Sequence, residues 1–216
     1  MPIENNRIVS VILNGGLSRR MDNKNKAFLQ LAGKPLIEHV LNKLRPPSET
    51  LIINSNDQNK RLEAYGLPIV KDSLDGFLGP LAGILSAMEW VSEYQPQCHL
   101  LASIPIDTPF LPDNLINKLH QRLLESQATL AFAASNGRIH PVIGLWPIAL
   151  MDDLRSAIVN EGILKVDLWT SRYKTTHLSF DYQTVDPFFN INHDDDLLQA
   201  KQFLLRGEIN NQGNAR

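Results

Sequence analysis

Short runs of apolar and β-branched residues recur along the chain, and stretches with helical spacing separate them. Runs of this length, bounded by polar or turn residues, are typical of buried strands. The predicted strands are, in chain order, Ile8 to Leu13, Leu51 to Ile53, Leu67 to Val70, His99 to Ile104, Thr129 to Ala134, His140 to Trp146 and Phe188 to Ile191.

Amphipathic helices are predicted between these strands. They are Pro35 to Leu44, Gly79 to Val91, Asp113 to about Leu124 with Asp113 as its N-cap, two stretches between residues 147 and 187, and about Asp194 to Leu205. This order predicts an α/β fold, a Rossmann-like three-layer sandwich with a mostly parallel, mixed sheet and helices on both faces. No linker divides the chain, so we expect one domain over residues 1–206 and a polar, disordered tail over residues 207–216.

Composition argues against several classes of protein, among them nucleic-acid-binding, secreted, membrane and zinc-binding proteins. The 216 residues carry a formal net charge of -2, which argues against a protein that neutralises many nucleic-acid phosphates. Cys98 is the only cysteine, so no intramolecular disulfide can form and a reducing compartment, the cytoplasm, is expected. The N-terminus does not resemble a signal peptide, and we expect no membrane association. The histidines show no zinc-binding spacing, and the three tryptophans lie in apolar stretches that indicate core positions.

Polar residues follow several predicted strands, and in open α/β sheets ligands bind at these strand ends. They are Asn14-Gly15-Gly16 with Ser18-Arg19-Arg20 and Lys24-Asn25-Lys26, then Asn54-Ser55-Asn56, Asp72-Ser73 and Asp107. Glycines and cations suit phosphate binding, and Asp107 is suited to Mg²⁺, which prefers one or two carboxylates plus substrate phosphates. Each has a plainer explanation by itself: a tight turn also needs glycine, Asp107 could cap the Thr108-Pro109 turn, and Arg20 could be a solvated surface residue.

Five blocks together resemble the molybdenum cofactor guanylyltransferases, the MobA family, in the same order. The blocks are LNGGLSRRM with NKAFLQLAGKPLIEHVLNKL, KDSLDGFLGPLAGILSAM, IPIDTPFLP, RIHPVIGLW and FFNINHDDDL. The resemblance extends from about Ile8 to Leu198. It implies a Mg²⁺-dependent nucleotidyltransferase that transfers GMP from GTP to the molybdopterin form of the molybdenum cofactor and releases pyrophosphate.

The resemblance also implies roles for individual residues. Leu13, Asn14, Gly15 and Gly16 lie in the loop that meets guanine and ribose in the family, and Lys26 is expected to be an exposed loop lysine that reaches the GTP phosphates. Asn54 and Asp72 match nucleotide-binding positions, with Asp72 reading the base or ribose, and Gly79 opens a helix close to the nucleotide. Asp107 matches the Mg²⁺ ligand. Asn190 and Asn192 match a pair that contacts the metal or the acceptor, and Arg20 or Arg19 assists with phosphate oxygens. His140 lies in a matching block that could approach the acceptor, but a packed, hydrogen-bonded histidine is the favoured interpretation.

Some positions depart from the family pattern, and alternatives remain open. Asn14 stands where alanine is usual, Asp22 where glycine is usual, and Asn25 where aspartate is common. The alternatives are a molybdenum cofactor cytidylyltransferase, a sugar-phosphate nucleotidyltransferase, or a non-catalytic nucleotide-binding homologue. The double glycine Gly15-Gly16 favours the guanine-using branch. The expected partners are GTP, molybdopterin and molybdoenzyme-delivery proteins, for a monomer or weak oligomer.

Overall fold

The central strand of the fold is β1 (Ile8–Leu13), whose six residues are all buried. It lies between two parallel neighbours, β4 (Thr50–Asn54) and β6 (Leu100–Pro105), with Leu13 opposite Asn54 on one side and Pro105 on the other. A strand buried on both faces needs no alternation of polar and apolar residues, which explains its continuous apolar sequence. The computed structural model describes residues 8–15, 25–45, 50–57, 60–76, 79–208 and 214–215.

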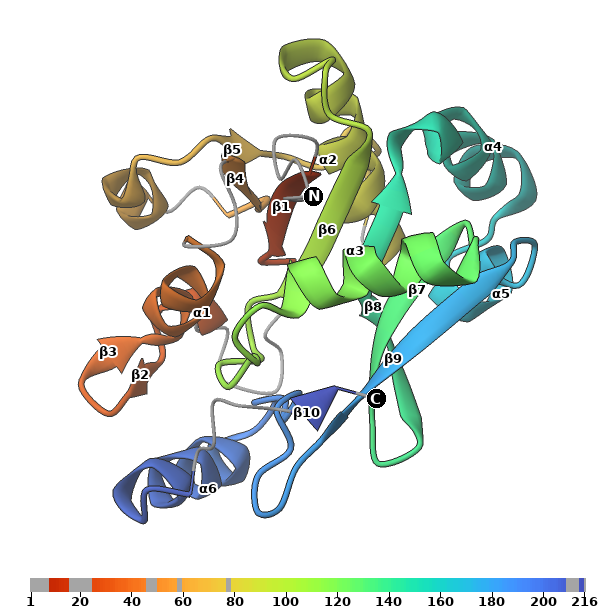
Figure 1. The fold of residues 1–216 in the computed structure, drawn as a ribbon. Coiled ribbons are helices and arrows are strands. Elements are labelled where there is room, and N and C mark those ends of the chain that lie inside the picture. The colour runs from red at the N-terminus through yellow and green to blue at the C-terminus, as the bar shows by residue number, and fades with distance from the viewer. Residues whose placement is uncertain are drawn as a thin grey trace.

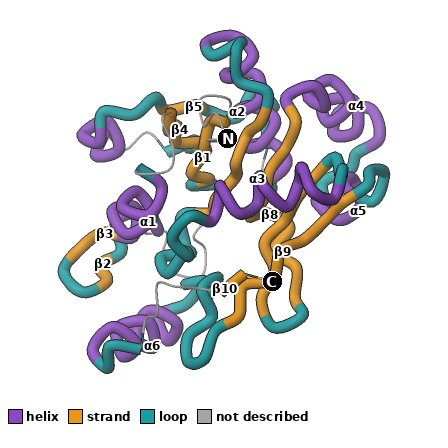
Figure 2. The backbone as a smooth tube through the Cα atoms, in the orientation of Figure 1, coloured by secondary structure: helices purple, strands orange, loops and turns teal. Residues whose placement is uncertain are grey.

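Within these described ranges the main sheet has eight strands in the order β10-β9-β7-β8-β6-β1-β4-β5 (Figures 1 and 2). The remaining strands are β5 (Ile69–Val70), β7 (Leu130–Ser135), β8 (Arg138–Pro147), β9 (Thr175–Asp181) and β10 (Asn214–Ala215). β8 runs antiparallel to both β6 and β7, whereas β7 and β9 are parallel. The mixed, mostly parallel α/β sheet predicted from the sequence is therefore confirmed.

Helices cover both faces of this sheet and form two apolar cores. On one face α1 (Leu36–Leu44) and α3 (Leu115–Ser126) pack with Ile8 and Ile12, and Figure 1 shows α3 crossing the sheet. On the other face α2 (Pro80–Tyr94), α4 (Met151–Glu161) and α5 (Val166–Thr170) pack with Val9 and Val11. Trp146 and Trp169 are fully buried in this second core and Trp90 is partly buried against it, as the apolar pattern predicted.

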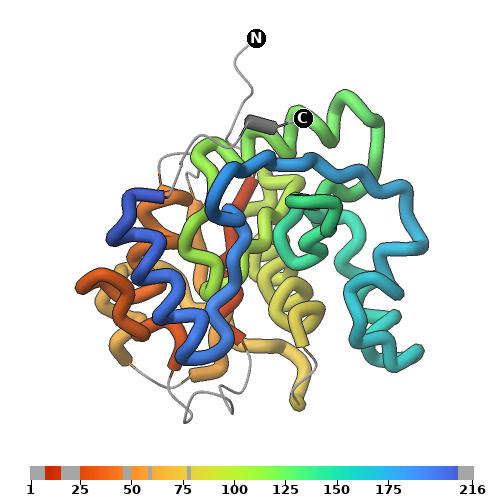
Figure 3. Tube along the Cα trace, turned by 90° about the horizontal axis from the view of Figure 1, so that it is seen from below, coloured from red at the N-terminus to blue at the C-terminus, as the bar shows by residue number. Residues whose placement is uncertain are grey.

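A third, smaller apolar cluster joins residues 29–36 to the residues in and before α6. The hairpin β2 (Gln30–Leu31) and β3 (Lys34–Pro35) packs with α6 (Asp194–Leu205) through Leu31, Ile191 and Ala200. Figure 3 shows α6 lying beside the β2–β3 and α1 region in the view from below. This packing brings the segment before α6 to the carboxyl ends of β1 and β6.

Several local predictions were wrong. Phe188 to Ile191 is not a strand: Phe188 and Ile191 are buried, but this segment is an irregular connection, and the missed strand is β9. Asp113 does not cap α3; Asn114 precedes the helix in a left-handed conformation, and Asp113 instead pairs with Lys43 at 2.7 Å. The helix Asp194 to Leu205 has the predicted bounds, and Asp194, Asp195 and Asp196 form its first turn.

The predicted domain boundary after residue 206 stays a prediction. Most of the expected tail, residues 209–213 and 216, lies outside the described residues. Asn214 and Ala215 pair antiparallel with Asp181 and Phe180 of β9. No helix among the described ranges combines the length and apolar character needed to cross a membrane.

Candidate active site

The strand order reverses at β1, and this reversal positions the candidate site. The chain moves from β1 to β4 and β5 on one side, and then returns through α2 to β6 on the other side. A crevice forms outside the carboxyl ends of strands at such a point. Leu13 ends β1 there, and the backbone N–H of Ile106 donates to its carbonyl at 3.1 Å. The residues that follow β1 and β6 therefore face one another.

At this crevice Lys26 and Asp107 form the centre of a hydrogen-bonded cluster. Lys26 Nζ donates to Asp107 Oδ2 and to Asn192 Oδ1, both at 2.7 Å. Asn190 Nδ2 donates to the other carboxylate oxygen, Asp107 Oδ1, at 2.9 Å. The Lys26 and Asp107 side chains are only 20% and 13% exposed. Four residues expected at the site are thus brought together, and both oxygens of the carboxylate are held.

Local structure fixes the Lys26 backbone. Asn25 precedes the 3₁₀ turn η2 (Lys26–Phe28), and its side-chain oxygen accepts from the Ala27 N–H at 2.9 Å. The Asn25 amide also donates to Asp57, so asparagine in place of the family's aspartate is well accommodated. The expectation of an exposed loop lysine was wrong, because Lys26 begins this turn and is largely buried against Asp107.

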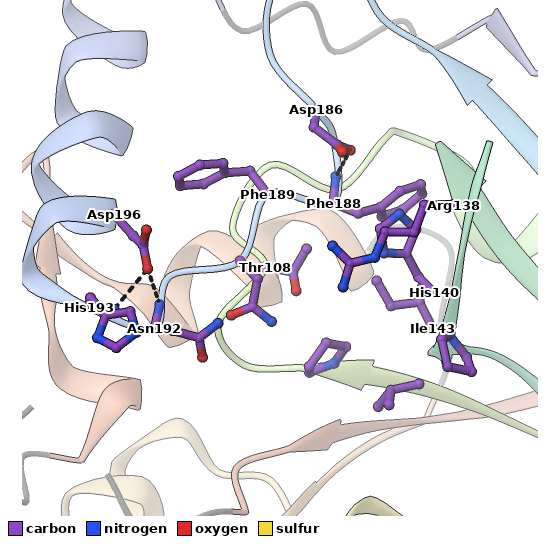
Figure 4. Close-up of a pocket in the computed structure, with 14 residues that line it drawn as sticks. Thr108, Arg138, His140, Ile143, Asp186, Phe188, Phe189, Asn192, His193 and Asp196 are labelled. Atoms are coloured by element: carbon purple, nitrogen blue, oxygen red, sulfur yellow. Dashed lines mark hydrogen bonds between the residues drawn. The ribbon is translucent and has the colours of Figure 1, made fainter. Parts of the chain in front are cut away.

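The Asn190–Asn192 segment is tied to Asp107 and to α6. The Ile191 N–H donates to the Asp107 carbonyl at 2.9 Å, which places the two asparagines on either side of the carboxylate. The Asn192 and His193 N–H groups both donate to Asp196 Oδ2 at 2.8 Å (Figure 4). Asp196 therefore caps α6 and holds this segment in place, as expected for an acidic residue in a first helical turn.

A second polar cluster lies at the ends of β4 and β5. Asn54 Nδ2 donates to Asp72 Oδ1 at 2.8 Å and to the Val70 carbonyl at 3.2 Å. Asn56 donates to Asp72 Oδ2 at 2.7 Å, while its own side-chain oxygen accepts from the Asp72 N–H at 2.9 Å. Asn54 is 3% exposed and its amide already donates to two acceptors, so it orients the Asp72 carboxylate. Asp72 is half-exposed and Asn56 is exposed, so both are open to solvent at this edge of the sheet.

The glycine-containing segments lie beside this second cluster. The Asn14 N–H donates to the Asn54 carbonyl at 2.9 Å, and the Asn14 side chain donates to Ser55 Oγ at 3.1 Å. Gly15 is exposed next to Asn54. Gly79 begins α2 as expected, with a φ of 75° that L side chains rarely adopt. Gly16, Arg19, Arg20 and Asp22 lie outside the described residues.

On the other side of the Lys26–Asp107 pair is a cavity of about 520 Å³ (Figure 4). β8, the turn after β6 and the connection from β9 to α6 line it. Asn190 and Asn192 belong both to its lining and to the cluster around Asp107. The cavity is therefore connected to the Lys26–Asp107 pair through these two asparagines.

His140, which the sequence placed near an acceptor, lines this cavity in a hydrogen-bonded chain. Ser135 Oγ donates to Asp186 Oδ2 at 3.0 Å and lies 2.7 Å from His140 Nε2. Because the single hydroxyl proton goes to Asp186, Ser135 accepts from His140, which assigns the Nε2–H tautomer. Ser135 is 1% exposed, so this chain orients groups and does not form a nucleophile.

Burial lowers the pKa of His140 below its usual value of 6.5; Asp186 opposes this shift and Arg138 adds to it. The folded protein thus favours the neutral ring, and the unfolded chain takes up a proton first as pH falls. We expect the free energy of unfolding to decrease as pH falls from about 6.5 through the lower folded pKa. In denaturant titrations, the free energy of unfolding of His140→Gln should depend less steeply on pH than that of wild type. Part of the pH dependence should remain because burial also lowers the pKa of His120. The exposed His177→Gln is the control, and an unchanged slope in His140→Gln would contradict the assignment.

The sequence assigned no role to Asn56, Ser135, Thr108, Arg138 or Asp186, although Asn56 was noted among the polar residues that follow a predicted strand. Asn56 had a usable signal, because it lies in the same strand-end run as Asn54. Arg138 lies in a block that carried the family resemblance, but nothing in the sequence showed that its neighbours form a cavity. Ser135 and Asp186 are 51 residues apart and meet only through the sheet.

Comparison with known proteins places this site in a family. Residues 10–172 match the family described as the MobA-like NTP transferase domain. Proteins named molybdenum cofactor guanylyltransferase from Rhodopseudomonas palustris (strain BisB5) and Bradyrhizobium sp. (strain ORS 278) are each 43% identical, over 91% and 90% of this chain and 94% and 92% of their own lengths. The crystal structure of molybdopterin-guanine dinucleotide biosynthesis protein A from Archaeoglobus fulgidus has the same fold, with a TM-score of 0.72 and 24% identity, covering 92% of this chain and 99% of that chain.

Proposed function

This chain belongs to the MobA-like NTP transferase family, and on that premise we propose that it transfers GMP from GTP to molybdopterin and releases pyrophosphate. The family resemblance read from the sequence motifs is confirmed. The observation that carries the proposal is the position of the Lys26–Asp107 cluster, between the Asn54–Asp72–Asn56 cluster on one side and the cavity on the other. A nucleotide and an acceptor bound on these two sides would meet at Lys26 and Asp107.

In this reaction a phosphate oxygen of the acceptor attacks the α-phosphorus of GTP, and the bond to pyrophosphate breaks. The main obstacles are repulsion between two anions and the charge that develops on the leaving group. The Lys26 ammonium binds phosphate oxygens and offsets that charge, and Asn192 orients it. Asn190 orients Asp107, and Asp72 fixes the nucleotide at the far end. The acceleration then comes from positioning and electrostatics, without a covalent enzyme intermediate.

Mg²⁺ fits the donors at this site. The carboxylate of Asp107 and the neighbouring amide oxygens are hard oxygen ligands. Among the described residues no three His, Cys, Asp or Glu side chains cluster, so this part of the chain supplies no complete cage. That pattern suits an ion held by one carboxylate and completed by substrate phosphates and water. When bound to Asp107, Mg²⁺ would supply Lewis-acid neutralisation of phosphate charge.

Two alternatives keep the fold and change the activity. A cytidylyltransferase is disfavoured because the similar relatives at 36–43% identity carry the guanylyltransferase name. A non-catalytic homologue is disfavoured because Lys26 and Asp107 are both present and in contact. We propose a cytoplasmic location, in keeping with Cys98 being the only cysteine, and propose molybdoenzyme-delivery proteins as recipients of the product.

Nucleotide binding tests the proposal most directly. Calorimetry with GTP, CTP, UTP and ATP, each with and without Mg²⁺, should show a preference for GTP that Mg²⁺ strengthens. The same protein with molybdopterin and GTP should then form the dinucleotide and pyrophosphate. Preference for CTP would move the assignment to the cytidylyl alternative, and GTP binding without transfer would favour the non-catalytic one.

A further inference from the structure

We propose that Arg138, Asp186 and Thr108 recognise the amino-oxo edge of the acceptor's pterin ring at the end of the cavity away from Lys26. This inference rests on the proposed function, which supplies the acceptor, and adds the residues that select it. The residues assigned to phosphate binding do not account for this cavity.

The cavity has polar side chains at both ends. Its Asn190 and Asn192 end contacts Asp107 and Lys26, where the reacting phosphate must lie. Arg138 approaches from β8 at the opposite end, with its guanidinium pointing into the cavity, and Thr108 lies between the two ends (Figure 4). A phosphate held at the first end would direct the attached ring system toward Arg138.

Arg138 and Asp186 present opposite charges to the same space without pairing with each other. Arg138 is exposed, and its side chain has no hydrogen bond or ion pair to any residue among the described ranges. Asp186 accepts from Ser135 and from the Phe188 N–H at 2.9 Å, which holds its carboxylate in place and leaves lone pairs free. A pterin edge carries N–H donors next to an oxo acceptor. The carboxylate can accept from the donors, while the planar guanidinium can donate to the oxo group.

Thr108 supplies an independent indication of a ligand. Its side chain is 0% exposed and lines the cavity, yet its Oγ1 has no hydrogen-bond partner among the described residues. A buried hydroxyl without a partner costs free energy, so such groups are rare unless something else satisfies them. We infer that the bound acceptor ring supplies this partner. Phe188, held against His140 with ring centroids 4.8 Å apart, and Phe189 offer apolar surface for the ring faces.

The ring edge can be tested with fluorescent probes that do not require turnover. We would titrate neopterin phosphate, and its lumazine counterpart in which an oxo group replaces the amino group, into the full-length protein. Wild type should bind the pterin at least about tenfold more tightly than the lumazine, since the carboxylate rejects the second oxo group. Asp186→Asn should abolish that preference, and Arg138→Gln should weaken pterin binding about tenfold. Arg122→Gln, an exposed arginine on α3, is the matched control.

The variant Thr108→Val tests whether the Thr108 hydroxyl contributes to ligand binding or to the stability of the fold. Removing an unpartnered buried hydroxyl while keeping the shape should leave the midpoint of thermal unfolding unchanged or raise it. The same variant should bind the pterin phosphate several-fold more weakly and show a raised KM for molybdopterin with kcat nearly unchanged. Lower stability with unchanged pterin affinity would overturn the role of Thr108.

The controls also separate this inference from the proposed function. All variants should bind GTP as wild type does, because none lies in the Asn54–Asp72 cluster. If wild type transfers GMP but Arg138→Gln and Asp186→Asn keep wild-type pterin selectivity, the recognition site is wrong and the function stands. If wild type binds GTP but gives no transfer to molybdopterin, the proposed function itself fails.

Discussion

Lys26→Met is expected to lose about 10²–10³-fold in the rate of GMP transfer, and Asp107→Asn at least as much, while both variants remain folded. Each change removes one charge from the pair that would contact the reacting phosphates. Neutral side chains of similar size preserve the packing around η2 and the turn after β6. Asn at position 107 can still accept a hydrogen bond, so loss of the cluster's geometry is limited.

The chain provides a matched control for this pair. Lys43 and Asp113 form an ion pair with the same 2.7 Å separation, between α1 and the start of α3 and away from the site. Lys43→Met and Asp113→Asn should therefore leave transfer unchanged, since exposed pairs contribute little to stability. Initial rates with saturating GTP and molybdopterin would measure the effects. Near-wild-type transfer in Lys26→Met would remove this lysine from the mechanism.

Metal binding distinguishes the two members of the pair. Mn²⁺ titrations followed by electron paramagnetic resonance, in the presence of GTP, should show loss of the tight site in Asp107→Asn. Lys26→Met should retain a metal site, because the carboxylate and the nucleotide phosphates remain. An unchanged Mn²⁺ affinity in Asp107→Asn would contradict its assignment as the metal ligand.

The sequence predicted best those elements whose local pattern agrees with their final environment. β1 and α6 have the predicted bounds, because one is a continuous apolar run and the other begins with three aspartates. β9 was missed because its residues alternate between buried and exposed, and its sequence TTHLSFD contains few large apolar residues. Phe188 to Ile191 was predicted as a strand because burial, not strand pairing, determines its composition. A run of apolar residues cannot distinguish a buried connection from a strand.

The contacts within the candidate site could not be predicted from any local sequence pattern, because they join residues that are far apart in the chain. Lys26 contacts Asp107 and Asn192, which are 81 and 166 residues away, and only the sheet order brings them together. The family resemblance identified these residues individually, but not the hydrogen bonds that orient them. The structure also distinguishes Asn54 from Asp72 by burial, because the Asn54 side chain is enclosed and the Asp72 side chain is half-exposed.

Gly83→Ala is expected to weaken GTP binding by roughly tenfold to a hundredfold, although alanine is the better helix former. Gly83 lies in the first turns of α2, directly against Asn54 of the Asn54–Asp72–Asn56 cluster. A Cβ atom there would lie 2.4 Å from Asn54 Oδ1 and 3.1 Å from Leu13 Cδ2. Real Cβ contacts of 2.4 Å do not occur, so Asn54 or α2 must move.

Asn54 cannot turn away without moving Asp72. Its amide is bonded to Asp72 and to the Val70 carbonyl, and its side chain is enclosed. Displacement would break the bond that orients the Asp72 carboxylate and shift Leu13 at the end of β1. We therefore expect calorimetry to show a higher Kd for GTP, with pterin binding unchanged because the cavity lies on the other side of Lys26.

The direction of the change in the free energy of unfolding distinguishes a close contact at Gly83 from an ordinary helix position. In an ordinary helix interior, replacing glycine by alanine stabilises the protein by about 1 kcal/mol. Overpacking at this contact costs about 1–3 kcal/mol, so the free energy of unfolding should fall or stay level instead of rising. Ser92→Ala, at an exposed position of the same helix, should show only the small gain from propensity and wild-type GTP affinity. If Gly83→Ala is stabilised and binds GTP normally, the close approach of α2 to Asn54 does not constrain the site.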